Sequence, residues 1–234
     1  MVMTLAGGIL FVFFAGNLTA ELLRRAGVAG FGSADGAGSV MVATLSLHGT
    51  ALVAGFLFLR LHGIGWREVA GLDATRWRRQ LALVTGTILA VLPVMFALKL
   101  FSEMTLRKLG WPLEDQRAVE LILSCHSTGL KIYLGIFAVI IAPVAEEFLF
   151  RGLIFSGFKK AGWPVSGWLV TSLLFALIHG SAPIFLPLFA FALALTWLYE
   201  KTDGLLAPML AHGAFNAINL ALLIAVQQLE PVAK

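Results

Sequence analysis

Long, nearly uninterrupted apolar runs alternate with short polar stretches along the chain. Seven runs approach the roughly 20 apolar residues that a helix needs to cross a bilayer, at residues 4–23, 39–61, 81–101, 132–155, 164–179, 183–199 and 205–226. The runs are continuously apolar, so they predict helices and not the alternating strands of a membrane barrel. The first run is interpreted as a span and not as a signal peptide, because no basic residue precedes it and Glu21 lies near its end.

Two polar connections hold enough apolar residues to lie at a membrane surface. Residues 66–80 combine Trp66 and Trp77 with several arginines, which is typical of a short helix at the headgroup level. Residues 113–125 mix aliphatic and acidic side chains and suit a second interfacial or re-entrant helix. We therefore expect a single all-α polytopic membrane domain over residues 1–234.

Composition excludes a water-soluble fold. Hydrophobic residues make up 59% of the 234 residues and charged residues only 13%, whereas soluble domains carry about 25% charged residues. The net charge of +4 does not indicate nucleic acid, because the basic residues lie between apolar runs, where they contact membrane lipids. We expect an integral multi-pass protein of the cell membrane. Its orientation stays open, since the basic residues divide almost evenly between alternate connections.

Ionisable side chains inside apolar runs are the informative positions, because each costs about 3 kcal/mol at the bilayer centre. Glu147 and Arg151 are four residues apart with the acid first, the favourable order for a neutralising pair on one helical face. Glu146 points about 100° away from Glu147 and has no cation on its own face. An acid held in this way suits a general base. The alternative is a pair of acids at a water-exposed helix end.

Two further patterns place polar groups on helical faces. Phe175 and His179 share one face at the end of a run, where the alternative is a satisfied interfacial histidine. His212 and Asn216 lie one turn apart in the last run and point the same way, where the alternative is hydrogen bonding between helices. In the first half, His48 near the middle of a run is interpreted as a packing or cavity residue.

Convergence of the polar groups of the second half would build a reactive site. Glu146 would supply a general base and His179 a second group that handles protons. His212 and Asn216 would supply hydrogen-bond donors to an oxyanion. These groups are sufficient for amide hydrolysis by activated water.

The three motifs occur in an order that resembles a known family. Glu-Glu-x-x-x-Arg at 146–151, Phe-x-x-x-His at 175–179 and His-x-x-x-Asn at 212–216 are similar to those of the CPBP family. This is the family of CAAX proteases and bacteriocin-processing enzymes, also called Abi, whose members are intramembrane endopeptidases related to the type II CAAX prenyl endopeptidase. The resemblance covers residues 132–226. It implies a helical bundle of seven or eight transmembrane helices, with interfacial helices and an intramembrane cavity open to cytosol and lipid.

The resemblance also implies roles for the site residues. Glu146 would activate water with the help of His179, while His212 and Asn216 form the oxyanion site. Glu147 and Arg151 match the second Glu and the Arg of the motif and, from their spacing, form a positioning pair; Phe175 supports His179. Zinc, which takes three protein ligands in catalytic sites, could be held by Glu146, His179 and His212. The sequence has no His-Glu-x-x-His motif, and a metal-free glutamate mechanism is preferred.

The expected substrate is a membrane-associated peptide or protein. A prenylated CAAX-type substrate is one class, and bacteriocin precursors, signal peptides and membrane-bound regulators are others. Motifs of rhomboid-type and presenilin-type proteases are missing. The alternative function is a non-enzymatic binding, immunity or transport protein that uses the same polar cavity. The confinement of the polar groups to the second half favours one hydrolytic site over a transporter with two similar halves. The oligomeric state stays open.

Overall fold

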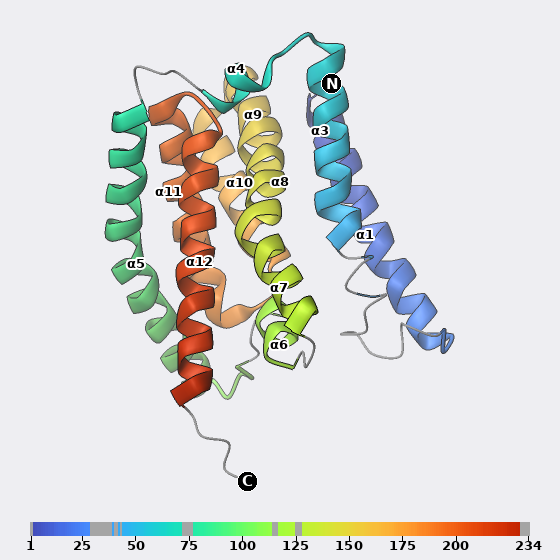
Figure 1. Cartoon of the computed structure of the whole chain (residues 1–234), viewed down its shortest axis with the longest axis vertical. Helices are drawn as coiled ribbons and strands as arrows, with labels where there is room; N and C mark the ends of the chain where they lie inside the picture. Colours follow the sequence, from blue (N-terminus) through green and yellow to red (C-terminus); the bar gives the residue numbers. More distant parts are fainter. Residues whose placement is uncertain are drawn as a thin grey trace. The chain divides into compact units, whose positions relative to one another are not determined.

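The computed structural model describes residues 2–28, 39, 42, 44–71, 77–113, 117–124 and 128–229. All regular structure over these residues is helical, without a strand among them (Figure 1). Five of the described helical stretches are long and apolar enough to cross a bilayer, namely Gly7–Arg25, Trp77–Lys108, Lys131–Lys160, Ala182–Thr202 and Leu206–Val226. Two shorter apolar helices are Leu45–Leu61 and Pro164–Ile178. The predicted all-α polytopic fold is confirmed.

These stretches correspond one to one to the predicted apolar runs. The shortest of these stretches is α10 (Pro164–Ile178), which has 15 residues and rises about 22 Å at 1.5 Å per residue. That is less than the roughly 30 Å of a hydrocarbon core. The helix ends before His179 because Gly180 adopts a positive φ of 64°, a conformation that glycine allows without strain.

Each predicted interfacial stretch contains a short helix. α4 (Trp66–Ala70) lies in the first stretch and α6 (Arg117–Ser124) lies in the second. The remainder of the first stretch includes the start of α5 (Trp77–Lys108). Residues 72–76, 114–116 and 125 of these stretches lie outside the described residues. A position at the membrane surface stays a prediction for both.

The chain divides into two compact units, of which the first comprises Met1–Val69 and Ala145–Thr171. Its main elements are α1 (Val2–Arg25), η1 (Leu45–Gly49), α3 (Thr50–Leu61), the end of α8 (Ala142–Glu147), η3 (Phe148–Phe155) and α9 (Ser156–Lys160). The η segments are π-helical, with a wider turn than an α-helix. Both α1 and α3 pack against η1 and η3. The approach is close, because a Cβ added at Gly55 would lie 2.5 Å from the buried Phe148 ring.

The second unit comprises Ala70–Val144 and Ser172–Lys234. Its main elements are α5, α7 (Thr128–Ile136), η2 (Phe137–Ile141), α11 (Ala182–Thr202) and α12 (Leu206–Leu229), with the end of α10. α5, α11 and α12 pack against one another, and α12 packs against η2. A Cβ added at Gly213 would lie 2.6 Å from the carbonyl oxygen of Val139. Glycine therefore lets α12 approach the backbone of η2. The single domain predicted from the sequence stays a prediction.

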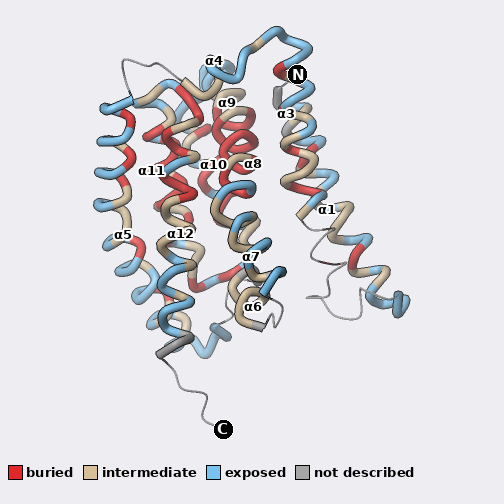
Figure 2. Tube along the Cα trace, in the orientation of Figure 1, coloured by how far each residue is buried: buried red, intermediate tan, exposed pale blue. Residues whose placement is uncertain are grey.

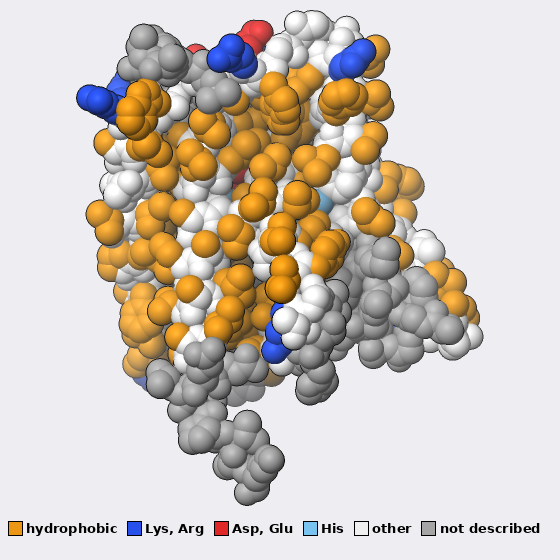
Figure 3. Space-filling view, in the orientation of Figure 1, with side chains coloured by type: hydrophobic (Ala, Val, Ile, Leu, Met, Phe, Trp, Pro, Cys, Tyr) orange, Lys and Arg blue, Asp and Glu red, His pale blue; other side chains and the backbone are white. Residues whose placement is uncertain are grey.

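Burial concentrates on a few helices (Figure 2). Nearly all of η3 is buried, including Arg151, and α11 is buried along much of its length. In contrast, α5 exposes large apolar side chains such as Leu89 and Phe96. Apolar side chains cover most of the surface seen in Figure 3. Basic residues occupy the last turns of several helices, among them Arg24 and Arg25, Arg107 and Lys108, Lys159 and Lys160, and Lys201. This distribution suits helices that cross lipid and end at its headgroups.

Replacing Gly213 by alanine tests the close contact between α12 and η2. The new methyl group would collide with a backbone carbonyl, which cannot rotate away, so Gly213→Ala should lower the free energy of unfolding by about 1–3 kcal/mol. Gly86→Ala is the matched control, because a Cβ there meets nothing within 4 Å. We expect the control to be neutral or to stabilise by up to about 1 kcal/mol. Unfolding of both variants in mixed micelles measures the difference, and equal stabilities would contradict the contact.

Candidate functional site

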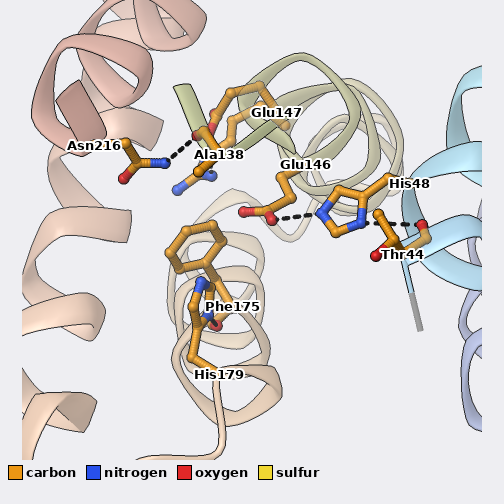
Figure 4. A network of polar contacts seen from close by, with 9 residues as sticks. Thr44, His48, Ala138, Glu146, Glu147, Phe175, His179 and Asn216 are labelled. Carbon is orange, nitrogen blue, oxygen red and sulfur yellow. Dashed lines mark hydrogen bonds and ion pairs between the residues drawn. The ribbon is translucent and has the colours of Figure 1, made fainter. Parts of the chain in front are cut away.

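Glu146 lies in the last turn of α8, in the first unit, and its residue is 7% exposed. Its Oε1 atom is 2.9 Å from Nε2 of His48 in η1, which precedes it by 98 residues (Figure 4). Both side chains are largely buried, with exposed fractions of 14% for His48 and 9% for Glu146. In the sequence, no cation lies on the helical face of Glu146. In the structure, the hydrogen-bond partner of Glu146 comes from a distant segment.

Glu147 and Arg151 form the predicted ion pair within the same unit. Nη1 of Arg151 donates to Oε1 of Glu147 over 2.9 Å, and both side chains are 0% exposed. The pair joins the end of α8 to η3, where most side chains are buried and apolar. Each charge therefore has its partner in a setting where an unpaired charge would be expensive. The prediction of a mutually neutralising pair is confirmed.

His179 follows the last residue of α10, in the second unit. Its Nδ1 atom lies 2.6 Å from the carbonyl oxygen of Phe175, and the two rings are 4.7 Å apart between centroids. The predicted common face is confirmed. A carbonyl oxygen only accepts hydrogen bonds, so Nδ1 carries the proton. Nε2 is then the nitrogen with the lone pair in a neutral ring.

His212 and Asn216 lie on α12, also in the second unit. The His212 residue is 3% exposed and meets the rings of Phe175 and Phe191 edge-on, each at 5.6 Å between centroids. Nδ2 of Asn216 donates to the carbonyl oxygen of Ala138 in η2 over 2.8 Å. This confirms for Asn216 the alternative of a hydrogen bond between helices. An amide nitrogen has two hydrogens, so the bond also orients a second N–H.

The site residues thus form two groups. Glu146, Glu147, Arg151 and the additional His48 belong to the first unit. Ring contacts join Phe175, His179 and His212 in the second unit, with Asn216 one turn further along α12. The convergence of the two groups on one reactive centre stays a prediction, as does the intramembrane cavity.

The donor set suggested for zinc comes from both units. Glu146 belongs to the first and His179 and His212 to the second. In the part of the chain that the structure describes, no three His, Cys, Asp or Glu side chains lie together as ligands of a metal ion. The hydrogen bond between Nδ1 of His179 and a carbonyl is of the kind that orients metal-binding histidines. This one contact does not make up a ligand set for a metal ion.

His48 is the site residue that reasoning from sequence missed. The sequence assigns it to packing or to a cavity, and the structure adds its direct hydrogen bond to Glu146. One signal was available, because His48 is an ionisable residue inside a predicted span, with Ser46 and Thr50 nearby. That signal indicates that His48 needs a partner and does not identify the partner.

Residues 128–218 match the family model described as type II CAAX prenyl endopeptidase Rce1-like. This stretch is therefore similar to that family, and we call it the Rce1-like region. It contains every site residue predicted from the sequence, namely Glu146, Glu147, Arg151, Phe175, His179, His212 and Asn216, and His48 lies before it. The family resemblance that the motifs predict is confirmed over these residues.

Two curated bacterial proteins are similar to part of the chain. The "Putative membrane peptidase YdiL" of Bacillus subtilis (strain 168) is 30% identical over 93 residues, which are 40% of this chain and 36% of that protein. The "UPF0177 protein YxdF" of Lactococcus lactis subsp. lactis (strain IL1403) is 35% identical over 78 residues, 33% of this chain and 42% of that protein. The matches thus span only about two fifths of these relatives. No solved structure gives a significant match to the chain.

Removing Arg151 tests the buried pair. Arg151→Met leaves the carboxylate of Glu147 without this charged partner and should lower the free energy of unfolding by about 3–5 kcal/mol. The double variant with Glu147→Leu should recover much of that loss, because neither charge is then buried. Lys99→Met is the matched control, since Lys99, which is exposed, pairs with the half-buried Glu103 on α5 over 3.6 Å, and its loss should cost less than about 1 kcal/mol. Unfolding in mixed micelles reports all three, and equal losses for both single variants would contradict the role of burial.

Proposed function

We propose that the protein is an intramembrane endopeptidase that hydrolyses a peptide bond of a membrane-associated substrate. The observation that carries the proposal is the match of residues 128–218 to the Rce1-like family. Glu146, His212 and Asn216 lie in this region on helices long and apolar enough to cross a bilayer, and His179 directly follows the shorter apolar helix α10. The name of the matched relative from Bacillus subtilis, "Putative membrane peptidase YdiL", agrees with this activity.

In the proposed reaction Glu146 acts as the general base. Its carboxylate takes a proton from a water molecule while the water oxygen attacks the carbonyl carbon of the peptide bond. His179 assists by accepting a hydrogen bond from that water at Nε2, since its Nδ1 is held by the carbonyl of Phe175. The proton taken by Glu146 then passes to the amide nitrogen as the carbon–nitrogen bond breaks. The products are a carboxylic acid and an amine.

His212 and Asn216 stabilise the oxyanion in this proposal. Each would donate a hydrogen bond to the carbonyl oxygen as negative charge develops on it. Their positions suit fixed donors, because aromatic rings surround His212 and the carbonyl of Ala138 holds the amide of Asn216. Donors that are already oriented need no reorganisation during the reaction, and removing one typically costs about 10²–10³ in kcat.

These roles require Glu146 and the polar groups of α10 and α12 to act on one peptide bond. Glu147 and Arg151 act as a positioning pair that fixes the turn containing Glu146.

The substrate in this proposal carries a membrane anchor, since the site residues lie on apolar helices. A prenyl chain, an acyl chain or a transmembrane segment would place the scissile bond at the depth of the site. Prenylated CAAX-type peptides are the first class to test because of the family match. We place the protein in the cell membrane, with lipids as its surroundings.

A cleavage assay tests the activity. The purified protein in vesicles is incubated with a farnesylated C-terminal CAAX peptide or its unprenylated counterpart, and products are identified by mass spectrometry. Glu146→Gln should lower kcat at least about 10²-fold, because the amide cannot accept the proton. Asn216→Ala should lower it about 10²–10³-fold, while the control Glu103→Gln on α5 retains activity. Cleavage unchanged in Glu146→Gln would overturn its role, and peptide binding without cleavage would favour the non-enzymatic function.

Metal chelation separates the two mechanisms that the residues allow. With glutamate as the base and no metal, treatment with 1,10-phenanthroline or EDTA should leave the cleavage rate within about twofold, because the activating group is a side chain. The rate is measured with and without chelator and again after zinc is added back. Loss of activity that zinc restores would show instead a metal-activated water.

A further inference from the structure

His48 contributes a polar group to Glu146 from outside the Rce1-like region. It lies in η1, and its Nε2 atom is 2.9 Å from Oε1 of Glu146. The two residues are 98 positions apart, so tertiary packing and not helical spacing makes the contact. Figure 4 shows the imidazole ring directed at the carboxyl group from the neighbouring segment.

The second nitrogen of His48 fixes how protons are arranged in this contact. Nδ1 lies 3.3 Å from the carbonyl oxygen of Thr44. That oxygen can only accept, so Nδ1 carries a hydrogen when the bond forms. The contact between Nε2 and Oε1 then holds a single proton, either on an imidazolium beside a carboxylate or on a carboxylic acid beside a neutral imidazole.

Tight packing holds the two segments in place. Leu47 and Ala51, on either side of His48, are 4% and 1% exposed. One turn beyond, Gly55 lies against the buried ring of Phe148, two residues after Glu146. His48 is thus well placed to control the orientation of the Glu146 carboxyl group.

We propose that His48 is a positioning residue for Glu146, an inference that rests on the proposed peptidase function. By holding one carboxyl oxygen, Nε2 fixes the plane of the group and so the direction from which it takes a proton from water. His48 also gives the largely buried carboxyl group of Glu146 a polar partner. It acts on the reaction through Glu146 and does not touch the substrate. Its loss should therefore change kcat and leave KM almost unaffected.

Two substitutions at position 48 separate positioning from packing. His48→Phe keeps an aromatic ring and removes the donor, so kcat should fall about 10–100-fold, as is typical when a partner that orients a catalytic group is lost, with KM within about threefold. His48→Gln keeps an N–H near the position of Nε2 and should restore kcat to within about fivefold of the original protein. His62→Phe is the matched control. Like Nδ1 of His48, Nδ1 of His62 contacts the carbonyl oxygen of the residue four positions earlier, here over 2.7 Å, but His62 is exposed.

A measurement without substrate tests the contact independently of catalysis. The protein labelled with ¹⁵N-histidine is studied by NMR in micelles, and the ring signals of His48 are assigned by their loss in His48→Gln. These signals should shift in Glu146→Gln and stay unchanged in Glu103→Gln. If the original protein cleaves no peptide while the shift is seen, the peptidase proposal fails and the contact stands. The positioning role is overturned if His48→Phe keeps the original kcat, or if folded His48→Gln and His48→Phe lose equal amounts of kcat. It is also overturned if the NMR signals of His48 do not change in Glu146→Gln.

Discussion

A charge inside an apolar helical bundle must find its partner within the protein, because neither lipid nor packed side chains can replace water. Glu146 and Glu147 are consecutive acids that meet this constraint differently. Glu147 uses Arg151, four residues away on the same helical stretch, so the helix itself brings the pair together. Glu146 points to another face and uses His48, which comes from a different segment. Only folding of the first unit creates that second partnership.

The polar contacts coincide with the π-helical segments. η1 carries His48, η2 carries the carbonyl that binds Asn216, and η3 contains Arg151. A π-turn has one more residue than an α-turn, which changes the direction of the following side chains and loosens the regular ladder of backbone hydrogen bonds. Such segments are frequent at functional sites. Small residues complement them, since Gly55 and Gly213 allow the close approach that brings the segments together.

Contacts within one helix could be predicted from the sequence, and contacts between segments could not. The spacing of four residues is enough to pair Glu147 with Arg151 and Phe175 with His179, and the structure contains both contacts. The apolar runs likewise predict the helices, because their length is set by the bilayer. Periodicity defines the face on which a residue lies and leaves unknown which segment packs against it. The partner of Glu146 is 98 residues away and that of Asn216 is 78 residues away, so both were missed.

The identity of each partner also determines which of the two acids is suited to chemistry. Arginine stays protonated in proteins, so a glutamate bound to it is held as half of an ion pair. Histidine gains and loses a proton near neutral pH, so a carboxyl group beside it can exchange a proton without leaving an isolated charge. Glu147, buried with Arg151, therefore suits a structural role. Glu146, beside His48, has the kind of partner that suits the general base that we propose.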